Sequence, residues 1–361
     1  MRVGVNALFL IPGEVGGSEV YVRNVLPLLT SVDADIDLAV FTNRENHETF
    51  AEFERIPLGV CARSRPRRII AEQIMLGRAV RRARLDLLFS PGYTAPLRVP
   101  NPQVVAILDV QFLDFPGDFT WAGRLVHRFL VGRAARAASA VATLSDFSKR
   151  QIHTHLDVPQ EKIVVSHLAA SQAFSEPQAC PYNKPFLLYV SNTYPHKNAQ
   201  RLARAFLSVA ERIPHDLVLV GQPRGGEPPP HPRIRRIHRL EHPGAELVGL
   251  FQGCDLFVFP SLYEGFGLPV IEAMAAGARV VAARAGSIPE VAGDAATYFD
   301  GTDEADIART ITEALNEPSD TRRNFVEAGR SRAAQFTWEA CARRTVAAFH
   351  LALDRSQRPH E

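Results

Sequence analysis

Two glutamates flank a stretch of glycine, proline and apolar residues in the second half of the chain. Glu264 and Glu272 are separated by seven residues, GFGLPVI. The apolar run 256–259 before them predicts a buried parallel strand. Pro269 suits the first helical position, and Gly277 suits a left-handed cap at the helix end. We therefore expect a strand, a loop over 261–268 and a helix over 269–276, with one carboxylate on each side of the helix start.

The start of such a helix is an anion site, because its first amides have no partner within the helix and glycines let a phosphate approach closely. The amides that we expect to face the ligand belong to Gly265, Phe266, Gly267 and Leu268. Two flanking carboxylates would repel a bare phosphate by several kcal/mol in a poorly solvated site. The ligand must therefore be anionic in its middle and rich in hydroxyls at both ends, as a nucleotide diphosphate sugar is. Each carboxylate would accept charge-assisted hydrogen bonds of about 1.5 to 3 kcal/mol from hydroxyls.

The stretch 260–281, PSLYEGFGLPVIEAMAAGARVV, resembles the signature of glycosyltransferase family 4, whose members are retaining enzymes of the GT-B fold. The resemblance continues in GGSEVYVRNVLPLL near the start and in TLSDFSKRQI, YVSNTYPHKNAQRLARAF, GSIPEVAGDAA and FTWEACARRT. It implies an α/β protein with two Rossmann-like doubly wound domains that face a central cleft. It also implies acceptor binding mainly by the first domain, donor binding mainly by the second, and a final helix that crosses back to the first.

By this resemblance Glu264 contacts the donor sugar, Glu272 the ribose and Lys197, in PHKN, the diphosphate. Lys197 also follows a predicted strand and a proline turn, which places it at the same edge of the sheet. We count Glu264, Lys197 and Asp109 as catalytic candidates. The further donor-binding candidates are Asn192, Leu240 and the pair Gly16 and Gly17, which follows the first strand and is either an anion cradle or only a turn.

Two positions depart from the family pattern. Many relatives carry an arginine near the start of the Lys197 loop, where this chain has Asn192 and His196. Neutralisation of the diphosphate would then rest on Lys197, the helix amides and another basic group. In VVAILDVQFLDFP the family histidine is replaced by Leu108 before Asp109. The contact of that histidine with the donor sugar is then absent, so another group takes over, the acceptor differs or activity is reduced. If the enzyme is active, an apolar side chain there would favour a donor that lacks one hydroxyl, such as a 6-deoxy sugar.

Apolar strand-like runs alternate with helical patterns along the whole chain, which indicates parallel sheets covered by helices on both faces. The strands that we predict lie at 3–10, 38–41, 87–90, 104–108, 140–143 and 163–165, and then at 186–190, 217–220, 256–259 and 280–283. The proline-rich stretch 174–185 separates the two sets. We expect a first domain over 1–178, joined by a helix over 337–357, and a second domain over 184–336.

Composition excludes several classes of protein. Hydrophobic residues make up 46% and charged residues 22% of 361 residues, which is typical of globular domains and not of disordered or collagen-like chains. A net charge of +2 does not suggest nucleic-acid binding. The first apolar run ends at Pro12 and indicates a strand rather than a signal peptide, and the four widely spaced cysteines suit a reducing compartment. We expect a cytoplasmic enzyme with a nucleotide-sugar co-substrate, no other cofactor and no metal, since no Asp-x-Asp motif follows a strand.

One segment is strongly basic. Residues 63–84 contain eight arginines, from Arg63 to Arg84, against the single acid Glu72. Such a segment suits a peripheral contact with anionic lipid. A solvated helix face explains it as well, since the segment contains no Trp or Phe.

Other candidates have structural explanations. Ser287 and Glu290 have the spacing of a helix capping box. Asp146, Ser148 and Lys149 line the acceptor side or belong to a helix cap. His153 and His155 lie on different faces of a helix, which argues against a metal pair.

Several functions remain open at this point. SNTYPHKN and FLDFP look most like bacterial mannosyltransferases that use GDP-mannose, and a UDP-sugar or deoxy-sugar donor is the alternative. The acceptor would be a glycan, a lipid-linked or a small-molecule hydroxyl. The rival classes are a retaining glycosidase, a non-catalytic nucleotide-sugar-binding protein and a nucleotide-sugar epimerase.

Overall fold

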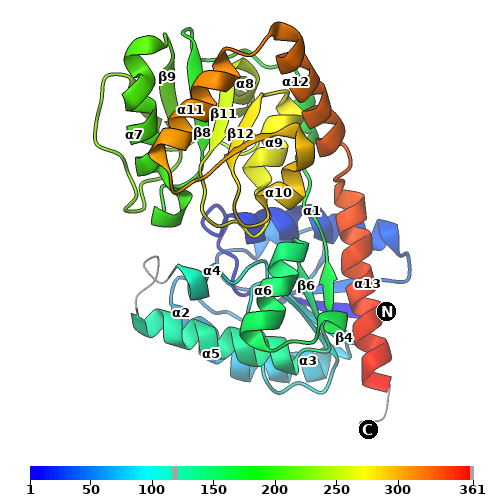
Figure 1. Ribbon diagram of the computed structural model, residues 1–361. Helices are drawn as coiled ribbons and strands as arrows, with labels where there is room; N and C mark the ends of the chain where they lie inside the picture. Colours follow the sequence, from blue (N-terminus) through cyan, green and yellow to red (C-terminus); the bar gives the residue numbers. More distant parts are fainter. Residues whose placement is uncertain (116–120, 358–361) are drawn as a thin grey trace. The chain divides into compact units, whose positions relative to one another are not determined.

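The computed structural model describes residues 1–115 and 121–357, and the chain in it divides into two compact units (Figure 1). Unit 1 comprises Met1–Leu168 and Trp338–Glu361, and unit 2 comprises Ala169–Thr337. Each unit contains one parallel β-sheet with helices packed on it. The α/β fold class that the sequence predicts, with two Rossmann-like doubly wound sheets, is therefore confirmed.

The sheet of unit 1 has seven parallel strands in the order β3-β2-β1-β4-β5-β6-β7. Their bounds are β1 Arg2–Asn6, β2 Asp37–Thr42, β3 Glu54–Pro57, β4 Leu87–Ser90, β5 Gln103–Ala106, β6 Ala140–Thr143 and β7 Ile163–Val165. Strand order reverses between β1 and β4, which is where ligands bind in doubly wound sheets. The edge strand β3 is absent from our prediction.

The helices of unit 1 connect these strands and cover both faces of the sheet. They are α1 Gly17–Val32, α2 Arg65–Ile70, the π-helical turn η2 Ala71–Leu76, α3 Gly77–Ala83, α4 Gln111–Asp114, α5 Trp121–Ala137, α6 Asp146–Leu156 and α13 Trp338–Gln357. Short 3₁₀ turns lie at η1 Glu48–Phe50 and η4 Gln160–Lys162.

The last helix, α13, packs beside α1 in unit 1 (Figure 1). A buried hydroxyl pair joins the two helices, because Tyr21 Oη and Thr345 Oγ1 lie 2.9 Å apart, and Ser166 Oγ, directly after β7, donates to the Cys341 carbonyl of α13 at 3.0 Å. Phe89 and Phe349 meet edge to face, with ring centroids 5.2 Å apart. Helix α13 is therefore part of the core of unit 1.

The sheet of unit 2 has six parallel strands in the order β10-β9-β8-β11-β12-β13. Their bounds are β8 Phe186–Val190, β9 Asp216–Val220, β10 Ile234–Ile237, β11 Leu256–Phe259, β12 Val280–Ala283 and β13 Thr297–Phe299. The order reverses between β8 and β11, so a second topological switch point lies there. The two edge strands, β10 and β13, are absent from our prediction.

Unit 2 contains six α-helices among the residues described, which are α7 Ala199–Val209, α8 Ala245–Gly253, α9 Leu268–Ala276, α10 Ile288–Ala292, α11 Glu304–Leu315 and α12 Ser319–Ala333. Its 3₁₀ turns are η5 Gln172–Ser175, η6 Pro195–Lys197, η7 Ala210–Arg212 and η8 Gly293–Ala295. Helix α9 begins one residue before its predicted start and ends at Gly277 in the left-handed conformation (φ 82°), as the sequence predicts.

None of the helices in the described ranges is both long enough and apolar enough to cross a membrane.

Candidate active site

Two loops of unit 2 meet at its topological switch point. The loop after β8 leads into η6, which carries Lys197, and the loop after β11 carries Glu264 before α9 begins. Since β8 and β11 are hydrogen-bonded neighbours and run parallel, both loops leave the same edge of the sheet. Lys197 Nζ donates to Glu264 Oε1 at 2.7 Å, and only 18% and 9% of these side chains are exposed. The structure thus brings together two of the three catalytic candidates.

Backbone and amide hydrogen bonds hold the two loops in this arrangement. The Leu262 amide donates to the His196 carbonyl at 2.8 Å. Asn198 Nδ2 donates to the Pro260 carbonyl at 3.1 Å and to the Gly301 carbonyl at 2.7 Å. Asn198 adopts a left-handed conformation (φ 62°), which an asparagine tolerates better than most residues. The ammonium of Lys197 is therefore presented by a fixed turn.

His196, the residue before Lys197, is a neutral part of this turn. It is almost fully buried and its ring stacks on Tyr194, with centroids 5.8 Å apart. Burial, and then the charge of Lys197, lowers the pKa of His196 to about 3. At neutral pH the imidazole carries no charge, so it does not supply the second basic group that we expected near the diphosphate.

The backbone of Glu264 is held on its other side by the start of α10. Ser287 Oγ donates to the Glu264 carbonyl at 3.0 Å, and the Ser287 amide donates to the same oxygen at 3.3 Å. Gly286 has φ +58°, and a Cβ atom at that position would lie 2.8 Å from the Glu264 nitrogen. The predicted capping box is wrong, because the Ser287 side chain makes no cap hydrogen bond to α10 and is used to position Glu264 instead.

The second carboxylate, Glu272, is also paired with a basic side chain. Glu272 lies in α9 and is 3% exposed, and its Oε1 is 2.6 Å from His242 Nε2. Burial opposes the charged imidazole, but the hydrogen bond to Glu272 and its charge outweigh burial and raise the pKa of His242. Our sequence reasoning missed His242. It lies in the irregular segment between β10 and α8. Because the sequence prediction also missed β10, no predicted strand end pointed to this histidine.

The remaining donor-binding candidates of unit 2 lie in the loops after β8, β10 and β11 and at the start of α9. Gly267 is the N-cap of α9 with φ 93°, and Leu268 is its first residue. Phe266 is buried and meets Phe336 edge to face at 5.7 Å. Asn192 Oδ1 accepts from the Gln222 amide at 2.9 Å, which ties the loops after β8 and β9 together. Leu240 is half-buried, and Gly265 precedes Phe266 in the loop. Their contacts with a donor stay predictions.

Three candidates belong to unit 1. Gly16 is the N-cap of α1, with φ 64°, and the exposed Gly17 is its first residue. Asp109 Oδ1 accepts from the Gln111 amide at 3.3 Å, at the start of α4. Leu108, before it, is only 4% exposed. The predicted roles of these residues stay predictions.

Local structure accounts for the polar residues near α6. Ser145 caps this helix, since its Oγ accepts from the Ser148 amide at 3.0 Å. His153 Nδ1 pairs with the Val158 carbonyl at 2.8 Å, and His155 Nε2 with Gln151 Oε1 at 2.9 Å. The two histidines thus have different partners. In the described parts of the chain, no group of three or more His, Cys, Asp or Glu side chains could hold a metal ion.

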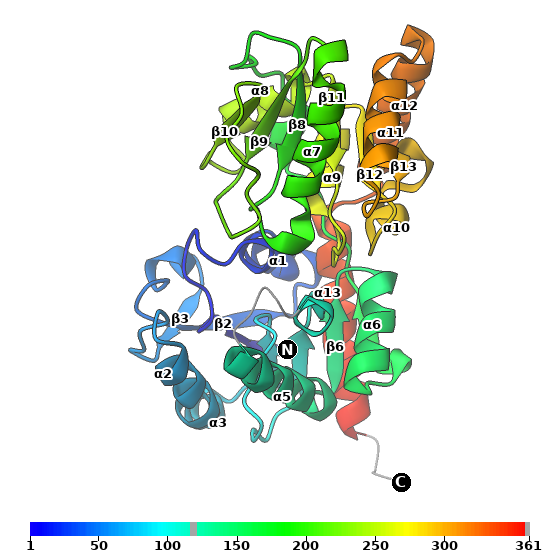
Figure 2. The ribbon, with the colours of Figure 1, turned by 60° about the vertical axis from the view of Figure 1, so that its left-hand side comes forward.

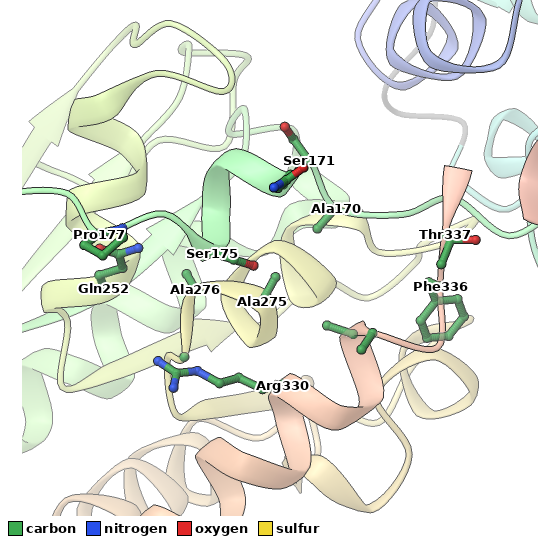
Figure 3. Close-up of a pocket in the computed structure, with 14 residues that line it drawn as sticks. Ala170, Ser171, Ser175, Pro177, Gln252, Ala275, Ala276, Arg330, Phe336 and Thr337 are labelled. Atoms are coloured by element: carbon green, nitrogen blue, oxygen red, sulfur yellow. The ribbon is translucent and has the colours of Figure 1, made fainter. Parts of the chain in front are cut away.

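A cavity of about 730 Å³ lies elsewhere in unit 2 (Figure 3). It is lined by η5, the end of α9 and the end of α12, with Ser171, Gln252, Arg330 and Phe336 among its residues. None of the predicted site residues lines it. The candidate active site is therefore defined by its paired side chains and not by this cavity.

Comparison with known proteins gives the family. Residues 15–169 match the model described as Glycosyltransferase Family 4, and residues 171–332 match the one described as Glycosyl transferases group 1. The chain belongs to glycosyltransferase family 4. Both matches together span almost all of both units, and Glu264 and Glu272 lie inside the match to Glycosyl transferases group 1.

Curated relatives of this family 4 chain include two mannosyltransferases. O-antigen chain mannosyltransferase B of Escherichia coli is 33% identical over 60% of this chain and 61% of its own length. MMP alpha-(1->4)-mannosyltransferase of Mycolicibacterium hassiacum is 30% identical over 65% of this chain and 61% of its own length. The chain thus matches about three fifths of the length of these relatives.

Among solved structures, Anabaena HepE in complex with UDP and glucose has a TM-score of 0.72 to this chain. The match covers 97% of this chain and 99% of HepE, at 18% sequence identity. This likeness supports the GT-B fold over the whole length of the chain.

Proposed function

We propose that the chain transfers a hexosyl group from a nucleotide diphosphate sugar to a hydroxyl of a glycan, lipid-linked or small-molecule acceptor, with retention at the anomeric carbon. GDP-mannose is the donor that we propose first, because both curated relatives described above are named mannosyltransferases. A UDP-sugar is the second candidate, because HepE was solved with UDP and glucose.

The observation that carries the proposal is the pair of Lys197 and Glu264 at the switch point, directly before the N-terminus of α9. An ammonium has three donors, and one of them is used by Glu264 Oε1. The other two are available for a diphosphate. The α9 amides add a second set of donors at the positive end of a helix dipole.

Each carboxylate has a separate role in this proposal. Glu264 would accept hydrogen bonds from the hydroxyls of the transferred sugar, through the oxygen that Lys197 does not use. Glu272 would accept from the ribose hydroxyls while His242 holds its Oε1. Hydrogen bonds from hydroxyls to a carboxylate contribute about 1.5 to 3 kcal/mol each, so both ends of the donor would be fixed.

In the reaction, the bond between the anomeric carbon and the diphosphate oxygen breaks, and its electron pair stays on that oxygen. The acceptor oxygen forms the new bond on the same face of the sugar. Its proton passes to the departing diphosphate oxygen. Lys197 and the α9 amides would stabilise the negative charge that grows on this oxygen, which is electrostatic catalysis by preorganised donors. Asp109 of unit 1 is the third catalytic candidate, and a metal-independent reaction stays a prediction.

The test uses the full chain with a panel of GDP- and UDP-sugars and two readouts. Thermal shift measures donor binding, which should stabilise the protein by about 2.7 kcal/mol at 100 times the dissociation constant. Release of nucleoside diphosphate with an acceptor panel, with and without EDTA, measures transfer. Glu264→Gln, which keeps the shape but removes the charge, should lose transfer.

Each rival function has its own signature in this test. Sugar released from a glycoside without any nucleotide would indicate a glycosidase, and a new nucleotide sugar without acceptor an epimerase. Tight donor binding without turnover on any acceptor would favour a nucleotide-sugar-binding protein. Absence of any shift with every nucleotide sugar would refute the proposal.

A further inference from the structure

The exposed large apolar side chains of the described residues all lie on two neighbouring segments of unit 1. Ile70, Ile74 and Met75 belong to α2 and η2, and they are 59%, 51% and 42% exposed. Leu125, Val126 and Phe129 belong to α5 and are 57%, 50% and 59% exposed. Singly exposed apolar residues are ordinary, but a cluster confined to one place marks an interaction surface. We call these six residues the apolar patch.

Both segments are amphipathic, so the patch is not a misplaced core. On the first segment Leu76 and Val80 are buried against Leu8 and Phe41 of unit 1. On α5, Val131 and Ala134 belong to the core cluster around Val105. The apolar patch is thus what remains on the outer side of each segment after its inner side has been packed.

The two segments lie side by side in unit 1. Figure 2 shows α2, α3 and α5 next to one another at one end of this unit, and the view in Figure 1 agrees. The charges of Arg68 and Arg65 on α2 reach His127 of α5, where they add to the effect of burial and lower the histidine pKa to about 4. The six apolar side chains are therefore carried by two neighbouring segments, which form one region of unit 1.

This region is also strongly cationic. The stretch 63–84, which contains α2, η2 and α3, carries eight arginines from Arg63 to Arg84, and α5 carries Arg124, Arg128, Arg133 and Arg136. Its acids are few, since α5 has none and Glu72, in η2, is buried and accepts from Thr94 at 3.0 Å. Exposed Arg67 lies one turn before Ile70, Arg128 adjoins Phe129, and Arg133 stacks on the Phe129 ring at 5.7 Å. Exposed cationic side chains therefore lie close to exposed apolar ones on both segments.

We propose that the apolar patch and the arginines around it bind the surface of a bilayer that contains anionic lipid. Apolar side chains would enter the boundary between headgroups and acyl chains, while the arginines pair with lipid phosphates. A protein partner would need acidic groups between apolar ones in a matching shape, whereas an anionic membrane offers both over any area. Since α5 adds Phe129 and two aliphatic residues, the solvated-face interpretation of segment 63–84 no longer explains the surface. This proposal does not depend on the proposed activity.

The experiment is co-sedimentation of the full chain with vesicles of phosphatidylglycerol and phosphatidylcholine in equal parts, and with phosphatidylcholine vesicles alone. We expect binding to the anionic vesicles only. Arg67→Glu with Arg128→Glu should lower the partition coefficient by on the order of 25-fold or more, since each basic residue contributes about fivefold. The double variant Ile74→Ser with Phe129→Ser should bind the anionic vesicles more weakly at low salt. At high salt it should not bind them at all, because salt screens the arginines but not the apolar insertion that these two residues provide in the wild type.

The matched control is Arg212→Glu with Arg323→Glu, which makes the same change in net charge at exposed positions of unit 2. It should bind as the wild type does. Equal losses in the control and in the Arg67 and Arg128 variant would overturn the proposal, as would failure of the wild type to bind anionic vesicles at an ionic strength of about 0.01 M. Concentration-dependent dimerisation that Phe129→Ser removes would assign the patch to a second copy of the chain and would also overturn it. Thermal melting of each variant checks that it is folded.

Discussion

Replacing Gly286 by alanine tests whether the position of Glu264 depends on the close approach of the β12–α10 turn. Gly286 has φ +58°, and a Cβ there would lie 2.8 Å from the Glu264 nitrogen and 2.9 Å from its carbonyl oxygen. Ordinary contact begins at 3.4 Å, so the backbone of Glu264 would have to move by about 0.6 Å. Because the Glu264 side chain is hydrogen-bonded to Lys197, this movement would lengthen the distance of 2.7 Å between Lys197 Nζ and Glu264 Oε1.

Two terms set the size of the effect. An alanine in a left-handed conformation costs about 1 to 2 kcal/mol. Overpacking against fixed backbone adds about 1 to 3 kcal/mol. For activity, a shift of 1 Å in a catalytic group can reduce rates about 100-fold, so we expect kcat/KM for the donor to fall by roughly tenfold or more.

The control is Gly59→Ala in unit 1. Gly59 has φ +65°, close to that of Gly286, but nothing lies within 4 Å of its hypothetical Cβ. It should therefore show the strain alone, with unchanged kcat/KM. The assay is chemical denaturation of both variants together with nucleoside diphosphate release over a range of donor concentrations. If Gly286→Ala and Gly59→Ala lose the same stability and both keep wild-type kcat/KM, the turn does not position Glu264.

Four further predictions concern single side chains. Lys197→Met should lower kcat by about 100-fold or more, as loss of a preorganised oxyanion donor does, and normal turnover would mean that another cation stabilises the diphosphate. Glu272→Ala should raise the donor dissociation constant about tenfold or more with little change in kcat, since its ribose contact is similar in ground and transition states; unchanged donor affinity in a titration would remove that role. Burial raises the pKa of Glu72, so the contribution of Glu72 to stability should be fullest below the ordinary value of 4.5 and should be lost as pH rises from there through the raised pKa. Glu72→Gln should remove this contribution from the pH dependence of denaturation curves, and the same pH dependence in the variant and the wild type would contradict it. Leu108→His should change the ratio of kcat/KM for matched hydroxylated and 6-deoxy donors, and an unchanged ratio would show that Leu108 does not face the sugar.

Sequence patterns predicted the central strands of both sheets and missed three strands, all at sheet edges. β3 (ERIP), β10 (IRRI) and β13 (TYF) are exposed along one side, so they need fewer apolar residues than the buried central strands. The bounds of α9 were predictable because proline and glycine act locally at its two ends. The edge strands have no such local mark, and only pairing with a neighbour defines them.

The partners of the two carboxylates were not predictable in the same way. Glu264 and Lys197 are 67 residues apart, and Glu272 and His242 are 30 residues apart. The fold of unit 2 brings each pair together. The sequence places Lys197 and Glu264 after predicted strands and Glu272 in a predicted helix, but it does not show which residues meet, and it gave no place for His242. Ser287 shows the same limit, because its spacing to Glu290 matched a capping box while its hydroxyl bonds the distant Glu264 carbonyl.

These pairings explain how two carboxylates can border a site for a diphosphate. A lone Glu264 or Glu272 would repel the ligand, but each holds a basic group on one of its oxygens. The carboxylate charge is then offset locally, and the second oxygen can still accept a hydroxyl. Of the two basic groups, Lys197 sits beside the start of α9 on a turn fixed by Asn198, so it can donate to a phosphate without leaving Glu264. In the proposed site the carboxylates would thus select a ligand with hydroxyls, and Lys197 would offset the charge of the anion between them.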